Sequence, residues 1–434
     1  MPQAASRDRL EQSLARIADP NGEGARACLT VYAEAARAAA DASDARQRAG
    51  QPLGTLDGAI VSIKDLFDVE GEVTRAGSKV LAEEGSPAAV DAPVVARLRA
   101  AGCVVVAKTN MSEFAFSGVG HNPHLGTPGN PTDRSRVPGG STSGGAVAVA
   151  DGMCEIAIGS DTGGSTRIPA ALCGIVGWKP SRQRVPTDGA FPLSFTLDSI
   201  GPMARSVAEC ADADAIMAGE RPAVLEPASL AGLRLGVVQG MPFEGIDDTI
   251  AKAWEGAVAR LGQAGAKLTE ETLALIADMI AVNSKGGFAP TEAYAIHRDR
   301  LKRRGPDVDQ NIRARIERGG SVPAADYIEM AQQRARLIRA MDARLGKLDA
   351  LILPTTPIVA PKLAEVATPE TFGPKNMMLL RNPSMINFFD LCAISLPLPR
   401  SGGLAAGLMV VARNGQDRHL FGIAAAVERL LASG

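Results

Sequence analysis

The chain has 434 residues, of which 46% are hydrophobic and 22% are charged. This balance is typical of a folded globular protein and excludes a largely disordered one. The 46 lysines and arginines nearly cancel the 48 aspartates and glutamates. The net charge of -2 therefore gives no electrostatic reason to expect a nucleic acid or an anionic membrane as a partner.

The N-terminal sequence carries early charges and no apolar run, so we do not expect a secretory signal. No apolar stretch approaches the ~18 residues that a membrane span requires. The six cysteines are scattered without a Cys-x-x-Cys pair, and most lie in apolar context. This pattern predicts buried thiols in a reducing compartment, and we expect a cytoplasmic protein.

The first half of the chain mixes helical patterns with short apolar runs. Residues 1–50 predict two alanine-rich helices, which the sequence Asp-Pro-Asn-Gly at 19–22 separates. Asp91 is expected to cap a helix that ends at Gly102. Residues 103–108 (CVVVAK) then predict a buried strand.

The second half continues the same alternation. Ser206 and Glu209 predict a capping box at a helix start, and residues 220–232 (ERPAVLEPASLAG) are the best candidate for a linker. Asp247 and Pro323 are each expected to open a long helix. Further strands are expected in LRLGVVQ, DALILP and LMVVAR, before an amphipathic helix at about 417–431. Helices that alternate with short buried strands predict an α/β fold with a mixed or parallel sheet.

The stretch PGGSTSGG at 138–145 has the composition of a flexible linker, yet it leads directly into further apolar elements. Gly140 and Gly145 are spaced as in a phosphate-binding P-loop, but Ala146 stands where that loop requires lysine. The Gly-x-Ser-x-Gly elbow of serine hydrolases also fails here. A second glycine- and serine-rich cluster, GSDTGGSTRIPA, follows at 159–170. Two such turns can present serines and backbone N–H groups to a substrate.

Serine chemistry needs a general base, because a serine hydroxyl is a weak nucleophile at neutral pH. Neither His297 nor His419 lies in a recognisable triad context, and His121 and His124 lie in a segment that reads as a polar loop. Lys64 lies in a strongly apolar, strand-like segment, where burial would lower its pKa far below the ~10.4 of free lysine. The alternative for this lysine is a structural ion pair with Asp65 or Asp68.

The run from Pro138 to Pro180, PGGSTSGGAVAVADGMCEIAIGSDTGGSTRIPAALCGIVGWKP, resembles the signature of the amidase signature hydrolases. This family uses a triad of a serine, a second serine preceded by a cis peptide bond, and a lysine. The resemblance extends upstream through KTNMSEFA at 108–115 and downstream through LDSIGPMARSV at 197–207 and LILPTTP at 351–357. It covers roughly residues 50 to 415.

The resemblance assigns a role to each matching position. Ser165 is similar to the nucleophile, Ser141 to the serine that relays the proton, and Lys64 to the base. The backbone N–H groups expected to form the oxyanion hole are those of Thr162, Gly163, Gly164 and Ser165. The residues expected to support the site are Asp161, Arg167, Gly139 and Gly140. For Asp161 and Arg167, a role in ordering the loop and a plain structural ion pair are both open.

The implied fold is α/β, with a large mixed sheet sandwiched between layers of helices. Although length alone favours two or three domains, the resemblance implies a single amidase domain over residues 1–434. It would comprise an N-terminal helical segment (1–50), a core that carries the signature (53–220), and a remainder that carries the specificity elements (233–434). Within that remainder, residues 286–322 and the C-terminal third belong to the part of the family that varies with substrate.

The implied activity is hydrolysis of the C–N bond of a small carboxamide to acid and ammonia, through a serine acyl-enzyme. Alternatives within the family are the A subunit of a tRNA-dependent amidotransferase and a hydrolase of allophanate- or biuret-type ureides. Residues 382–397 look more like those of the free-standing amidases. A catalytically inactive scaffold is disfavoured because all three triad positions are filled. We expect a small amide substrate, no cofactor, no metal, no nucleic acid and no membrane, and a homodimer is kept open.

Overall fold

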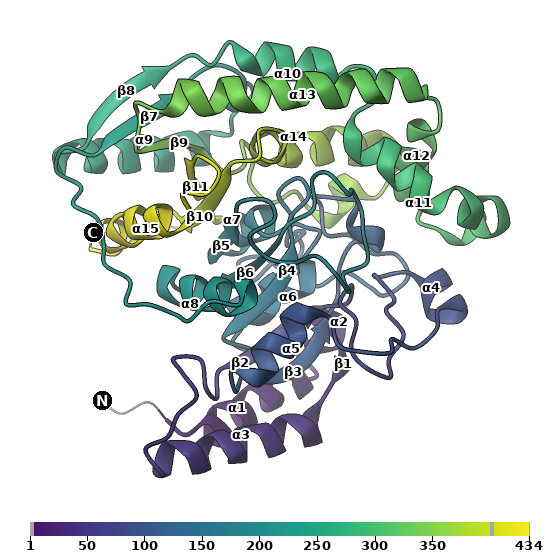
Figure 1. Cartoon of the computed structure of the whole chain (residues 1–434). Helices are drawn as coiled ribbons and strands as arrows, with labels where there is room; N and C mark the ends of the chain where they lie inside the picture. The colour runs from purple at the N-terminus through teal and green to yellow at the C-terminus, as the bar shows by residue number, and fades with distance from the viewer. Residues whose placement is uncertain (1–3, 400–402, 434) are drawn as a thin grey trace.

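The strands of the chain form one 11-stranded sheet in the order β1-β3-β2-β4-β6-β5-β10-β11-β9-β7-β8 (Figure 1). The computed structural model describes residues 4–399 and 403–433. The strands are β1 (Cys28–Val31), β2 (Ile60–Lys64), β3 (Val104–Thr109), β4 (Ile156–Ser160), β5 (Val176–Lys179), β6 (Ile200–Ala204), β7 (Arg234–Val238), β8 (Lys267–Glu271), β9 (Ala350–Pro354), β10 (Cys392–Pro397) and β11 (Gly407–Ala412).

Helices connect these strands. In the first half they are α1 (Ser6–Ala18), α2 (Gly24–Ala27), α3 (Ala33–Arg48), α4 (Lys79–Glu84), α5 (Pro93–Ala100), α6 (Ser143–Ala150), α7 (Arg167–Cys173) and α8 (Val207–Ala218). In the second half they are α9 (Asp248–Gln263), α10 (Leu275–Asn283), α11 (Phe288–Arg304), α12 (Gln310–Gly319), α13 (Ala324–Leu345), α14 (Pro369–Phe388) and α15 (Asp417–Ala432). Short 3₁₀ turns lie at Glu113–Ala115, Met241–Phe243, Gly305–Asp307 and Leu363–Val366.

The sheet is mixed, as the sequence predicts. β2 pairs in parallel with both β3 and β4, and β7 pairs in parallel with both β8 and β9. Between these two parallel groups, β6, β5, β10 and β11 pair with their neighbours in antiparallel fashion. The inner strands are buried on both faces, which explains why they read as continuous apolar runs without alternation.

Helices cover both faces of the sheet. Side chains from successive positions of β2 enter different cores, since Ile60 packs with α1, α3 and α6 while Val61 packs with α5 and α8. In the C-terminal half of the sheet, α9 and α15 cover the face to which Val61 belongs. The helices α10, α13 and α14 cover the opposite face there (Figure 1). The prediction of a sheet between layers of helices is confirmed.

The N-terminal region differs from the prediction of two helices. Residues 28–31 form β1, a short edge strand that pairs antiparallel with β3. Four residues between alanine-rich helices give too little pattern to be recognised as a strand, and the pairing with β3 stabilises them. The predicted cap at Asp91 is also wrong: the N-cap of α5 is Ala92, and Asp91 accepts from the Glu70 N–H and pairs with Arg99.

Several local predictions are confirmed. Ser206 and Glu209 form the capping box of α8, and Asp247 caps α9 through the Thr249 N–H. Residues 220–232, the predicted linker, contain no helix or strand, and this connection runs outside the helices at the left of Figure 1. All six cysteines are buried. Across residues 4–399 and 403–433, no helix combines the length and apolarity needed to cross a bilayer.

Candidate active site

Lys64 is the last residue of β2 and therefore lies at the carboxyl end of that strand. Because β2 and β4 are parallel neighbours, the end of β4 at Ser160 lies beside it. The lysine side chain is fully buried, and its Nζ donates to Ser141 Oγ at 2.7 Å and to Ser160 Oγ at 2.9 Å. Asp65, one alternative partner for this lysine, instead pairs with Arg75 at 3.0 Å. Lys64 therefore contacts hydroxyl groups and forms no ion pair with any described residue.

Two other lysines, Lys108 and Lys179, are also buried but lie in different surroundings. Lys108 is 3.2 Å from a carboxylate oxygen of Glu72. Lys179 donates to the carbonyl oxygens of Pro180 and Leu391. Of the three, only Lys64 contacts a serine hydroxyl among the described residues.

The surroundings of Lys64 favour its neutral form. Burial lowers the pKa of Lys64 to about 7, against the opposing attraction of the Asp161 and Asp198 carboxylates. Burial also raises the pKa of Asp198 to about 6, and that carboxyl accepts from Thr162 Oγ1 at 2.5 Å. Near neutral pH, a large fraction of Lys64 can therefore accept a proton.

Ser141 lies on the glycine-rich turn that precedes α6, and the Gly140–Ser141 peptide bond is cis. The turn is packed so closely that only glycine fits before the serine. A Cβ on Gly140 would lie 2.5 Å from the Gly120 nitrogen, and a Cβ on Gly139 would lie 2.9 Å from Pro169 Cα. Gly139 also has a φ of +83°, which disfavours other residues. These two glycines let the turn bring the Ser141 hydroxyl to Lys64.

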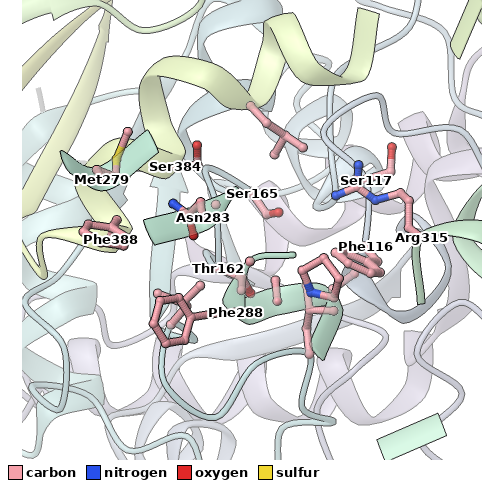
Figure 2. Close-up of a pocket in the computed structure, with 18 residues that line it drawn as sticks. Phe116, Ser117, Thr162, Ser165, Met279, Asn283, Phe288, Arg315, Ser384 and Phe388 are labelled. Atoms are coloured by element: carbon pink, nitrogen blue, oxygen red, sulfur yellow. The ribbon is translucent and has the colours of Figure 1, made fainter. Parts of the chain in front are cut away.

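Ser165 lies on the second turn, between β4 and α7, and is 3% exposed. It lines a cavity of about 240 Å³, which we call the Ser165 cavity. Figure 2 shows Ser165 between two groups of side chains, with Met279, Phe288 and Phe388 on one side and Phe116 and Arg315 on the other. Both glycine-rich turns meet here, because the Thr142 N–H donates to the Ser165 carbonyl at 3.3 Å.

The backbone N–H groups of the second turn differ in their availability. Among the described residues, those of Thr162, Gly163 and Ser165 donate to no protein acceptor. Gly164 departs from the expectation, because its N–H already donates to Asp161 Oδ1 at 2.8 Å. Three N–H groups of residues that line the Ser165 cavity therefore have no protein acceptor among the described residues, whereas that of Gly164 has one.

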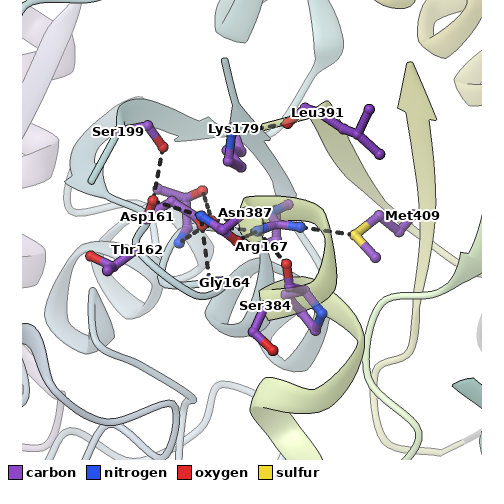
Figure 3. Close-up of polar contacts among 12 residues, drawn as sticks. Asp161, Thr162, Gly164, Arg167, Lys179, Ser199, Ser384, Asn387, Leu391 and Met409 are labelled. Atoms are coloured by element: carbon purple, nitrogen blue, oxygen red, sulfur yellow. Dashed lines mark hydrogen bonds and ion pairs between the residues drawn. The ribbon is translucent and has the colours of Figure 1, made fainter. Parts of the chain in front are cut away.

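Asp161 and Arg167 form an ion pair beneath this turn, and both side chains are fully buried (Figure 3). Two nitrogens of Arg167 contact the carboxylate, at 2.9 and 3.0 Å. Burial would raise the pKa of Asp161, but the Arg167 guanidinium and the Asn387 amide hold it well below its usual range. The same carboxylate accepts from the N–H groups of Gly164 and Thr166, so this ion pair also orders the loop.

Replacing Arg167 by methionine is expected to lower the free energy of unfolding by about 3–5 kcal/mol, because Asp161 would remain buried without its partner. Denaturant unfolding measures the change. Arg134→Met is the matched control, since Arg134 pairs with Asp151 near the surface and is 46% exposed. We expect a much smaller effect there. Equal losses in the two variants would contradict a special role for the buried pair.

The structure adds three polar residues to those that the sequence indicated: Ser160, Asp198 and Asn387. Ser160 binds Lys64, Asp198 binds Thr162, and Asn387 donates to Asp161 Oδ1 at 2.9 Å. Each lies inside or directly beside a segment that resembles the family, but no spacing rule distinguishes these residues from their polar neighbours. Only the sheet topology brings them to the site.

The family model described as Amidase matches residues 8–421. The chain is 36% identical over 404 residues to 2-amino-5-chloromuconic acid deaminase of Comamonas testosteroni, covering 92% of this chain and 87% of the relative. It is 34% identical over 458 residues to the A subunit of glutamyl-tRNA(Gln) amidotransferase from Symbiobacterium thermophilum, covering 97% and 92%. A crystal structure of an amidase superposes with a TM-score of 0.87 at 32% identity, covering 98% of this chain and 96% of that one.

The fold and the site thus define a hydrolase of the α/β class with its polar residues at the carboxyl edge of the sheet. The chain belongs to the amidase signature family. It is an amidohydrolase that acts on carbon–nitrogen bonds.

Proposed function

We propose that this enzyme hydrolyses a small carboxamide to the carboxylic acid and ammonia, with Ser165 as the nucleophile. The observation that carries the proposal is the 2.7 Å hydrogen bond from buried Lys64 to Ser141, on the turn that contacts Ser165. A neutral lysine in this position can withdraw a proton through one hydroxyl from another.

The reaction would proceed in two halves. As Ser165 Oγ attacks the amide carbon, its proton moves to Ser141, and the Ser141 proton moves to Lys64. The tetrahedral oxyanion would accept hydrogen bonds from the free N–H groups of Thr162, Gly163 and Ser165, worth roughly 3 kcal/mol for each effective donor. Collapse breaks the C–N bond, and the relay returns the proton to the leaving nitrogen, which departs as ammonia. Water then attacks the ester by the same route and releases the acid and Ser165.

The dimensions of the Ser165 cavity favour a small substrate. Its volume of about 240 Å³ is below the roughly 300–1,000 Å³ of typical drug-sized sites. Its walls combine apolar side chains with the reacting serine, so one compact acyl group would fill it. No part of this reaction requires a metal or an organic cofactor.

Two other activities of relatives give the alternatives. One relative is named as part of an amidotransferase, and such a protein would deliver its ammonia to a partner. A ureide hydrolase would use the same serine on a different carbonyl. The resemblance of residues 382–397 to free-standing amidases supports the simple hydrolase. These residues include Asn387, whose amide binds the Asp161 carboxylate beneath the Ser165 turn.

A panel of aliphatic, aryl and ureide amides tests the proposal on the purified chain. We expect ammonia and carboxylic acid in equal amounts from at least one small carboxamide, at several turnovers per second or more, without a second protein. Ammonia and acid are measured separately, because a ureide would give carbamate or carbon dioxide instead. Turnover that appears only when a partner is added would favour the amidotransferase alternative and overturn the proposal.

A further inference from the structure

Arg315 is the single charged residue among the residues that line the Ser165 cavity in the described part of the chain. It comes from α12, within the segment 286–322 that is expected to vary with substrate. Neither aspartate nor glutamate lines the cavity. The cavity therefore offers a positive charge, and its walls hold nothing that neutralises it.

The guanidinium of Arg315 is held in place but lacks an anionic partner. Its Cζ lies 4.4 Å from the centre of the Phe116 ring, which orients the guanidinium plane. Its Nε is buried without a hydrogen-bond acceptor, and no carboxylate of the described residues forms an ion pair with it. Burial and the nearby Arg318 lower the pKa of Arg315 to about 10, so it still carries its charge at neutral pH.

Two other arginines of this region, by contrast, form ion pairs. Arg313, two residues away on the same helix, binds Glu317 at 2.7 Å on the surface. Arg334, which also lies over aromatic rings, forms an ion pair with Asp390. Arg315 is half-buried, and a charge that has lost part of its solvent is costly without a partner. At the wall of a substrate cavity, the missing partner is most simply part of the substrate.

We propose that Arg315 binds a carboxylate of the substrate, so that the preferred substrate is an amide that also bears a carboxylate group. The inference rests on the proposed amide hydrolysis at Ser165. Because ammonia is the leaving group, the carboxylate belongs to the acyl part, as in the half-amide of a dicarboxylic acid. A guanidinium matches a carboxylate with two parallel N–H···O bonds. Figure 2 shows Arg315 across the cavity from Phe288 and Phe388, so the apolar middle of the substrate would lie between these walls.

Matched pairs of amides test this assignment. Succinamate and glutaramate carry a terminal carboxylate, and butyramide and valeramide replace it with a methyl group. For the wild-type enzyme, we expect kcat/KM to be roughly 10- to 100-fold higher for the acidic member of the better pair. In Arg315→Gln, this ratio should fall to near one. In Arg313→Gln, the matched control on the same helix, it should stay at the wild-type value.

Arg315→Met, which keeps the aliphatic stem, repeats the test should the glutamine variant fail to fold. The proposal is overturned if either folded variant keeps the wild-type ratio, or if the wild-type enzyme hydrolyses the neutral amides as well as the acidic ones. In both cases amide hydrolysis itself would stand, so the two proposals fail separately. Calorimetric titration with succinate and glutarate needs no turnover. Binding to the wild type that weakens at least 10-fold in Arg315→Gln supports the assignment, and binding that is absent or unchanged refutes it.

Discussion

Ser165→Ala is expected to abolish the acyl-enzyme and to lower kcat by roughly 10⁴-fold or more, because no other group can form the covalent bond. Ser165 is almost fully buried at the base of its cavity, where the Ser141 turn meets it. The alanine side chain fits the same space, so the fold should be unaffected. Intact-protein mass spectrometry after a rapid acid quench, with a slowly turned-over amide, should show an adduct on the wild type and none on the variant.

Ser143→Ala is the matched control for this experiment. Ser143 belongs to the same glycine-rich stretch as Ser141 and is equally buried, but its Oγ donates only to the Asn110 carbonyl, at 3.4 Å. The activity of the Ser143→Ala variant and its acyl-enzyme adduct should resemble those of the wild type. An adduct that persists on Ser165→Ala, or that maps to Ser143 by peptide digestion, would refute the assignment of the nucleophile.

Lys64→Met is expected to lower kcat/KM by about 10²- to 10⁴-fold, because it removes the group that accepts the proton. The pH dependence of kcat/KM in the wild type is the more specific test of Lys64. With a Lys64 pKa of about 7, kcat/KM should fall tenfold for each pH unit below about 7 and level off above it. A flat profile between pH 5 and pH 8 would exclude Lys64 as the base.

Stability should respond to the same lysine with a defined sign. Its pKa is lower in the folded state, about 7, than the usual 10.5, so the unfolded chain binds more protons between these values. The contribution of Lys64 therefore makes the protein more stable as the pH rises from about 7 towards 10. Lys64→Met, which buries no charge, should exceed the wild type in stability most at pH 7 and below, and the difference should shrink near pH 10. Chemical denaturation at several pH values measures it.

The fold was largely predictable where local pattern and burial agree. The sequences of β2, β3 and β9 are apolar runs because each strand is buried on both faces. The starts of α8 and α9 are marked by N-cap residues that sequence patterns can identify. β1 was missed because four residues hold too little pattern. The strand order could not be predicted, because nothing in residues 392–397 indicates that they pair with a strand more than 200 positions earlier.

Some residues of the site could likewise be predicted from the sequence and others could not. The long, specific run around Ser141 and Ser165 pointed to the two turns, and the apolar context of Lys64 marked it as unusual. The catalytic roles themselves stay predictions until the variants are measured. Ser160, Asp198, Asn387 and Arg315 were not indicated, because serine, carboxylate, amide and guanidinium groups occur throughout the chain. These four residues can be assigned to the site only because segments distant in the sequence contact one another, and the order of the strands in the sheet brings those segments together.

That sheet order has a consequence for how the protein is made. β10 lies against β5 in the middle of the sheet, yet it follows β5 by more than 200 positions in the chain. During synthesis, the edge of β5 that pairs with β10 stays uncovered until residue 392 has left the ribosome tunnel, whereas β11 follows its partner β9 closely in the chain. The nascent chain would therefore present the unpaired apolar edge of β5 while all the residues up to β10 are made, which at the average rate takes tens of seconds. The middle of the sheet is therefore completed by a strand that is made long after its neighbour, and a delay in making β10 would leave β5 open to pairing with the wrong strand.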